Sequence, residues 1–321
     1  MARILITGGS GFIGTNLVEY YKRLGYHITN LDVAHPRNPE HFSFWKRVDI
    51  LDKEALAHAV VGADPEIVVH LAARTDLAGK TIGDYSANTD GVANLISSLE
   101  ALEGLQVAVF ASSMLVCRIG YKPIDELDYA PSTPYGESKI VGENLVRRIA
   151  ANNFRWVIVR PTSIWGPWFQ TPYRDFFTAI QRGYYVHARG IRVKRSYGFV
   201  LNTVYQLAQL ASPNGELLAG KTIYLADHEP LEIGSWANMI QSTLGARRIR
   251  EVPLSVLKLA ARCGDMLKLC GYKNPPITSF RLNNMLSEMI HDTTPLQKIY
   301  GKLPCTTEEG VAITCNWLRL H

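Results

Sequence analysis

A tyrosine and a lysine four residues apart, Tyr135 and Lys139, lie in the stretch PYGESK. At this spacing the two side chains project from one face of a helix, one turn apart. An unperturbed phenol has a pKa of roughly 10, and a neighbouring ammonium group stabilises the phenolate. The pair could therefore exchange protons near neutral pH, with Lys139 lowering the pKa of Tyr135. A solvated helix face would show the same spacing, so the interpretation depends on the neighbouring residues.

Two serines, Ser112 and Ser113, end the apolar run VAVFASS (107–113) upstream of that pair. A continuous run rich in apolar residues is typical of a strand buried in a parallel sheet. The carboxyl ends of such strands form the edge at which open α/β sheets bind ligands. A serine hydroxyl at that edge could orient a reacting hydroxyl or carbonyl group beside Tyr135.

A glycine-rich turn follows the first apolar run, RILIT (3–7), and precedes a helical pattern. Gly9, Gly11 and Gly14 form G-x-G-x-x-G, and Gly8 adds a second glycine spacing. Between a strand and a helix this motif indicates a dinucleotide site, because glycines allow a pyrophosphate to reach the helix N-terminus.

The second apolar run ends in Asp32, 18 residues after Gly14. A carboxylate at this position accepts hydrogen bonds from the adenosine ribose and repels a 2′-phosphate, which favours NAD. His35 and Arg37 follow closely, so NADP stays open as the less favoured cofactor.

Apolar runs alternate with amphipathic helical patterns through the first half of the chain. The runs are 3–7, 27–32, 66–72, 107–113 and 156–161, and the helical patterns are 12–25, 53–60, 89–102 and 136–153. This alternation predicts an α/β fold, a Rossmann-type doubly wound parallel sheet with helices on both faces. The aromatic, proline-rich stretch 165–177 is more typical of a pocket lining or lid than of a core strand.

One further strand is expected at 221–227, and the chain after Glu229 reads as mainly helical. We therefore predict an NAD-binding domain over 1–165, to which 195–227 returns. A smaller, mainly helical substrate-binding part is predicted over 166–194 and 228–321.

Composition excludes several classes of protein. The net charge of +5 comes from scattered cations with short clusters at 189–195 and 247–250, which fits an anionic small molecule better than nucleic acid. Neither a membrane-spanning apolar run of about 18 residues nor a signal-peptide pattern is found, which predicts a cytoplasmic protein without a membrane partner. Five cysteines without a CxxC pair predict reduced, mostly buried thiols, and the nine histidines form no ligand-spaced cluster, so no metal is expected.

With these motifs in order, the chain resembles the extended short-chain dehydrogenase/reductases that act on nucleotide sugars, over nearly its whole length. The resemblance implies Ser113, Tyr135 and Lys139 as catalytic residues. It implies substrate contacts at Thr75, Ser112, Ser163 and Arg195, with the arginine gripping the sugar-nucleotide pyrophosphate. It also implies a homodimer, a role in polysaccharide biosynthesis, and a cofactor site formed by Gly8, Gly11, Phe12, Ile13, Gly14, Asp32, Asp49, Ile50, Leu71, Ala72, Ala73, Asn88, Tyr135, Lys139 and Pro161.

Some positions depart from the family pattern. Val116, Cys117 and Arg118 replace a common valine-tyrosine-glycine, and Ser163 and Asn202 stand where many members carry asparagine and aspartate. Because of these changes, the resemblance does not determine the identity of the substrate. Cys117 could act as an acid or be a plain pocket residue.

The resemblance implies an NAD-dependent nucleotide-sugar epimerase, commonly acting at C4. A reductase of a nucleotide-linked 4-keto-sugar would use the same residues, and a non-catalytic dinucleotide-sensing protein is a third alternative. Retention of Ser113, Tyr135 and Lys139 favours an enzyme. A 4,6-dehydratase is disfavoured because Met114 and Leu115, which follow Ser113, cannot exchange protons.

Overall fold

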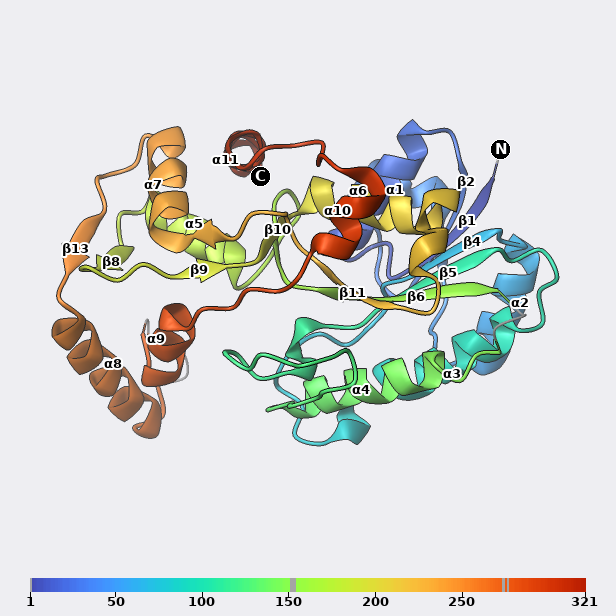
Figure 1. The fold of residues 1–321 in the computed structure, drawn as a ribbon, viewed down its shortest axis with the longest axis horizontal. Coiled ribbons are helices and arrows are strands. Elements are labelled where there is room, and N and C mark those ends of the chain that lie inside the picture. Colours follow the sequence, from blue (N-terminus) through green and yellow to red (C-terminus); the bar gives the residue numbers. More distant parts are fainter. Residues whose placement is uncertain (1, 151–153, 273–274, 276) are drawn as a thin grey trace.

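Seven parallel strands form the central sheet of this computed structural model, which describes residues 2–150, 154–272, 275 and 277–321 (Figure 1). Their order is β11-β6-β5-β4-β1-β2-β3. They are β1 (Arg3–Thr7), β2 (His27–Asp32), β3 (Trp45–Arg47), β4 (Ile67–His70), β5 (Val107–Ala111), β6 (Arg155–Pro161) and β11 (Thr222–Leu225). The order reverses between β1 and β4, and doubly wound sheets bind ligands in the crevice at that point. The predicted fold class is confirmed.

Successive residues of each strand point to opposite faces of the sheet, so both faces carry apolar side chains that need cover. Helices cover both faces. Ile4 and Ile6 of β1 pack in one core cluster, and Leu5 packs in another on the opposite face. The first cluster includes residues from α1 (Phe12–Arg23), α6 (Val200–Ala211) and α10 (Thr294–Tyr300). The second includes residues from α2 (Lys53–Ala63), α3 (Ser86–Leu99) and α4 (Pro134–Val146).

A smaller, mainly helical part lies beyond the carboxyl end of the sheet, to the left in Figure 1. Its helices are α5 (Tyr173–Gln181), α7 (Ile233–Leu244), α8 (Leu254–Leu269), α9 (Ser279–Leu286) and α11 (Thr307–Leu320). Three short strand pairs accompany them: β7 (Ser163–Trp165) with β10 (Tyr197–Phe199), β8 (Val186–Ala188) with β13 (Arg250–Val252), and β9 (Lys194–Arg195) with β12 (Leu231–Glu232).

Aromatic side chains form the core of this smaller part. Trp165 and Phe177 are fully buried, and the Trp165 ring lies 5.2 Å from that of Trp236 between centroids. The expectation that 165–177 lines a pocket or forms a lid is therefore wrong for these two side chains. Large rings in this short stretch build a core where few aliphatic residues are available.

Local differences from the sequence-based elements have simple reasons. Strand β3 was not expected, because three residues are too few to show a pattern. Strand β4 ends at His70, and α4 ends at Val146, short of the predicted limits at 72 and 153. Residues 151–153, the end of that predicted helix, lie outside the described residues.

The cysteines are less buried than the sequence predicts. All five are free, but only Cys117 and Cys315 are buried, whereas Cys263 and Cys270 of the α8 region are exposed. The reason is the orientation of α8, whose buried face is formed by other residues. Among the described residues, no helix is long and apolar enough to cross a bilayer.

Candidate active site

The glycine turn joins β1 to α1 at the point where the strand order reverses. Gly8 has a φ of +75°, which favours glycine, and a Cβ on Gly14 would collide with the carbonyl oxygen of Gly8. The N-cap of α1 is Gly11, which offers no side-chain hydrogen bond to the first turn. Backbone N–H groups there are open to an anion, so the turn fits the pyrophosphate of a dinucleotide.

Asp32 is held against this turn at the end of β2. Its Oδ2 accepts a hydrogen bond from the backbone N–H of Ser10 at 3.0 Å, and its Oδ1 accepts one from Ala34 N at 2.9 Å. Arg37 donates a hydrogen bond to the carbonyl oxygen of Trp168 at 2.6 Å. The position of Asp32 suits contact with an adenosine ribose.

The other residues predicted to line the cofactor follow the same edge of the sheet. Asn88 ties two of these segments together: its Oδ1 accepts from Arg74 N at 2.9 Å, and its Nδ2 donates to Ser138 Oγ of α4 at 2.9 Å. Of the remaining predicted residues, Asp49 is exposed, Ile50 is buried under α3, and Pro161 closes β6 beside Leu225. The half-buried ones are Phe12, Ile13, Leu71, Ala72 and Ala73.

Tyr135 lies in the first turn of α4, whose start is specified by the sequence. Thr133 caps the helix by accepting a hydrogen bond from Gly136 N at 3.1 Å, and Pro134 occupies the first turn. A Cβ on Gly136 would collide with the carbonyl oxygen of Leu115. This close approach brings Tyr135 to Ser113, whose side chain hydrogen-bonds the phenol.

Lys139 lies one helical turn further on and is buried, with 5% of its surface exposed. Its Nζ donates to the carbonyl oxygen of Ala111, at the end of β5, at 3.0 Å. Burial lowers the pKa of Lys139 to about 8, and attraction to Glu143 opposes this shift.

The pKa of Tyr135 differs from the value expected from the sequence. Burial raises it above the ordinary phenol value, and the hydrogen bond with Ser113 opposes that increase. Lys139 is not among the causes of this shift, and its Nζ donates to the carbonyl oxygen of Ala111. The lowering expected from the sequence combines Lys139 with the positive charge of a bound nicotinamide, so it stays a prediction for the protein with its cofactor.

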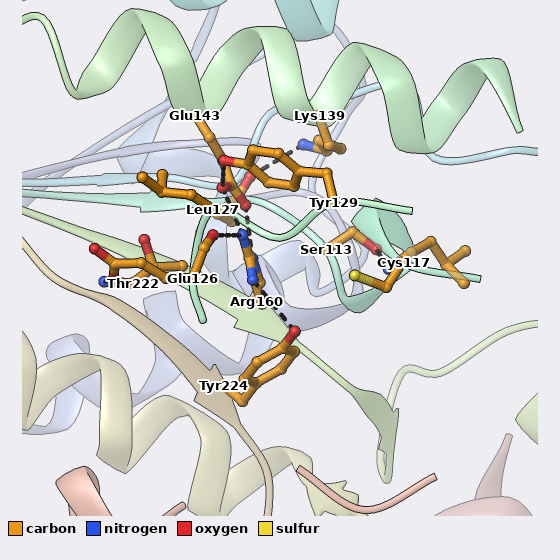
Figure 2. Close-up of polar contacts among 12 residues, drawn as sticks. Ser113, Cys117, Glu126, Leu127, Tyr129, Lys139, Glu143, Arg160, Thr222 and Tyr224 are labelled. Carbon is orange, nitrogen blue, oxygen red and sulfur yellow. Dashed lines mark hydrogen bonds and ion pairs between the residues drawn. The ribbon is translucent and has the colours of Figure 1, made fainter. Parts of the chain in front are cut away.

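A buried ionic network that was not predicted from the sequence lies behind these residues (Figure 2). Arg160 of β6 donates from Nε and Nη2 to the two carboxylate oxygens of Glu143, both at 2.8 Å. Tyr129 donates its hydroxyl to Glu143 at 2.7 Å, and Arg160 Nη1 donates to the Tyr224 hydroxyl at 3.2 Å. The sequence does contain a signal for this network, namely Arg160 inside the apolar run 156–161, because a buried charge requires a partner.

Glu143 belongs to α4 one turn after Lys139, so the network anchors the helix that carries the proposed acid and base. A small cavity of about 20 Å³ lies beside them, lined by Lys139, Glu143, Ser112 and His70 among others. Ser112, predicted to contact substrate, thus lines the interior behind Lys139. Ser113 instead bonds Tyr135.

Cys117 is buried, and its Sγ donates to the carbonyl oxygen of Asp128 at 3.4 Å. Burial raises the pKa of this thiol above its ordinary value. A neutral thiol bonded to the backbone is the arrangement expected of a packing residue.

The predicted substrate residues are spread over a wider area. Thr75 is exposed, and buried Ser163 hydrogen-bonds Tyr173. Arg195 of β9 donates from Nε to the carbonyl oxygen of Ser287 at 2.9 Å. Its Nη2 is buried and has no hydrogen-bond partner in the described part of the chain, and the Arg195 side chain also interacts with Tyr197 and holds down the pKa of that phenol.

A cavity of about 1250 Å³ lies between β8, α7, α8 and α9. Lys194, which precedes Arg195 on β9, is one of its lining residues. Arg189 and Arg192 also line it, as the basic cluster in the sequence predicts for an anionic ligand. No cluster of three or more potential metal ligands occurs within the described ranges.

A profile of the NAD dependent epimerase/dehydratase family matches residues 4–199, more than half of the chain. The chain belongs to this family. The resemblance to the extended short-chain dehydrogenase/reductases, in the nucleotide-sugar epimerase branch, is thereby confirmed.

Similar proteins include both reductases and epimerases. The 2-alkyl-3-oxoalkanoate reductase of Stenotrophomonas maltophilia is 26% identical, with 96% of this chain and 97% of the relative covered. The N-acetyl-alpha-D-glucosaminyl-diphospho-ditrans,octacis-undecaprenol 4-epimerase of Escherichia coli O157:H7 is 24% identical, with 99% and 96% covered. The structure of UDP-glucose 4-epimerase from Thermotoga maritima, solved with UDP-glucose, superposes with a TM-score of 0.74 at 20% identity, covering 99% and 98%.

Proposed function

We propose that this enzyme is an NAD-dependent epimerase that inverts a secondary hydroxyl, at C4, of a sugar linked to a nucleoside diphosphate. The observation that carries the proposal is the convergence of Ser113, Tyr135 and Lys139 at the carboxyl edge of the sheet, next to the glycine turn. A dinucleotide at the turn and a sugar at Tyr135 would meet at this edge.

The side chains divide the chemistry between them. Tyr135 takes the proton from the sugar hydroxyl, and Ser113 orients that hydroxyl by hydrogen bonding. Lys139 holds the nicotinamide ribose, while Asp32 favours NAD over NADP. NAD held by these residues would supply the hydride chemistry that oxidation of the sugar carbon and its reduction from the opposite face require.

Arg195 is proposed to hold the diphosphate of the substrate. Its buried Nη2 and the cations of the adjoining cavity supply the donors that phosphate oxygens require. The UDP-glucose bound by the T. maritima enzyme supports a nucleoside diphosphate, whereas the name of the E. coli relative, with its diphosphate on undecaprenol, supports only a sugar diphosphate.

A ketoreductase is the second candidate. The 2-alkyl-3-oxoalkanoate reductase matches nearly the whole chain, and reduction would use the same serine, tyrosine and lysine. The two reactions differ in cofactor balance, because an epimerase regenerates its NAD in each cycle and a reductase consumes one NAD(P)H per turnover.

The test is incubation of natively purified protein with a panel of UDP-, dTDP-, GDP- and CDP-hexoses, followed by NMR of the products. Mass spectrometry of the protein under native conditions identifies any nucleotide that co-purifies. We expect bound NAD and an inverted hydroxyl without net oxidation or reduction. The matched control is Tyr135→Phe, which keeps the fold of the site and lacks the proton-transferring hydroxyl.

Three results would contradict the proposal in different ways. Stoichiometric NAD(P)H consumption with a keto substrate would establish the reductase. A 4-keto-6-deoxy sugar would establish a dehydratase. Absence of turnover on the panel, with equal nucleotide binding by the wild type and Tyr135→Phe, would favour a dinucleotide-sensing protein.

A further inference from the structure

Helix α8 carries apolar side chains on its outer face as well as on its inner one. Leu257, Ala261 and Gly264 recur at intervals of four and three residues and are buried against α9 and its approach. Leu259 and Met266 lie two residues further along this repeat, which places them on the opposite side of the helix. They are 63% and 66% exposed. An exposed helix face ordinarily carries polar residues at such positions.

The apolar surface continues around α8 and onto α9. The other large apolar side chains that are exposed there are Val256, Leu267, Leu269, Tyr272, Phe280 and Met285. Single exposed apolar residues are ordinary on a protein surface, whereas a group of this kind on two adjoining helices indicates a contact surface. We call the exposed residues of α8 and α9 the α8–α9 face. It lies at one end of the molecule, at the lower left in Figure 1.

The charges on α8 are predominantly positive. Lys258, Arg262 and Lys268 are exposed. The acidic residue of the helix, Asp265, accepts hydrogen bonds from Ser279 N at 3.1 and 3.3 Å and so caps α9. The face therefore combines apolar side chains with cations, the composition of a helix that lies in a membrane interface.

We propose that the α8–α9 face docks on the surface of an anionic phospholipid bilayer. Leu259, Met266 and their apolar neighbours would enter the headgroup boundary, and Lys258 and Arg262 would bind lipid phosphates. A second copy of the chain is a poorer partner, because a two-fold contact would bring the same cations against one another.

This contact differs from the membrane partner that the sequence analysis excludes. That expectation rests on the lack of an apolar run long enough to span, and none of the described helices is long and apolar enough to cross a bilayer. A helix lying in the interface needs one apolar face rather than a spanning run, and only the folded orientation of α8 reveals that face.

The large cavity lies on the inner side of α8, away from Leu259 and Met266. Leu257 and Ala260 of α8, with Met285 of α9, belong both to these helices and to the cavity wall. The proposal does not rest on epimerase activity, since vesicle binding requires no turnover.

The test is flotation of the full chain with vesicles made of equal parts phosphatidylcholine and phosphatidylglycerol, compared with vesicles of phosphatidylcholine alone. We expect binding to the mixed vesicles that weakens as salt is raised. Leu259→Gln/Met266→Gln should weaken that binding by about tenfold or more, because two side chains no longer enter the apolar layer. Lys258→Gln/Arg262→Gln should remove most of the preference for anionic vesicles.

The matched control is Leu217→Gln, which changes a side chain that is 79% exposed in another region of the chain, beside α6. It should bind vesicles like the wild type. Equal binding by the wild type and the Leu259→Gln/Met266→Gln variant, or no binding of the wild type to mixed vesicles, would overturn the proposal. A dimer in sedimentation velocity that this double variant disperses, without vesicle binding, would instead show an interface between two copies.

Discussion

Helices α4 and α8 carry charged side chains in opposite ways. On α4, Lys139 and Glu143 are buried, and each has a defined hydrogen-bond partner in the protein. On α8, Lys258 and Arg262 are exposed beside the exposed Leu259. The first arrangement holds reacting groups at fixed positions, as acid–base chemistry requires. The second leaves side chains free to adapt to a partner surface.

The two regions also differ in how closely the chain follows its family. The family profile matches residues 4–199, which include the glycine turn and all of α4, and does not extend to α8. Close backbone approaches at Gly14 and Gly136 restrict the residue type in the matched region. No such steric restriction acts on the exposed residues of α8. We therefore take their residue types to reflect the contacts that this chain makes at that surface.

The largest expected effect is on the catalytic side of the comparison. Tyr135→Phe should lower kcat by about 10²–10⁴-fold, because general acid–base catalysis by the phenol is lost. Cofactor binding, measured by fluorescence titration, should change little. Tyr129→Phe is the matched control, since it removes a buried hydroxyl from the Glu143 network rather than from the reacting group. Near-normal turnover by Tyr135→Phe would remove this residue as the acid and base.

Removal of one partner of the buried ion pair should reduce stability. Arg160→Met should cost about 3–5 kcal/mol in the free energy of unfolding, because the carboxylate of Glu143 loses its bidentate partner inside the protein. Urea denaturation measures this change. The double variant Glu143→Leu/Arg160→Met should be less destabilised than Arg160→Met, since no uncompensated charge remains. A double variant as unstable as the sum of the single ones would show that the pair acts mainly through packing.

The pKa of Lys139 predicts a pH dependence of stability. Burial lowers this pKa to about 8 from the ordinary 10.5, so between these values the unfolded chain binds more protons than the native one. The free energy of unfolding should therefore rise with pH across this window, by about 3 kcal/mol from this group. Lys139→Met should lack the contribution, and subtracting its pH profile from that of the wild type removes effects of other groups. Parallel profiles would show that Lys139 has an ordinary pKa in the native protein.

The smallest expected effect belongs to the substrate side. Arg195→Lys should raise KM for a nucleotide sugar about tenfold while changing kcat less, because a single ammonium replaces a planar guanidinium at the diphosphate. Steady-state kinetics separate the two constants. Arg23→Lys is the matched control, because it makes the same change at an exposed arginine of α1 that does not line the cavity. An unchanged KM for Arg195→Lys would place the diphosphate elsewhere.

Much of the fold and part of the candidate site could be predicted from the sequence, because these features depend on local rules. The apolar runs at 3–7 and 27–32 became strands with the predicted bounds. The glycine turn lies at the reversal of the strand order, Asp32 ends the neighbouring strand β2, and Tyr135 and Lys139 lie one turn apart on α4. Helical periodicity, strand burial and glycine dihedrals depend on residues that are close in the chain, so they can be predicted from the sequence.

Tertiary structure decided the features that depend on distant partners. Arg160 needs Glu143 from another element, and Asn88 needs Ser138, 50 residues away in the chain. Burial decided the direction in which the pKa of Tyr135 moves, and no spacing rule contains that information. Likewise, the sequence of α8 has two apolar faces, and only packing against α9 determines that Leu257 is buried while Leu259 meets the solvent.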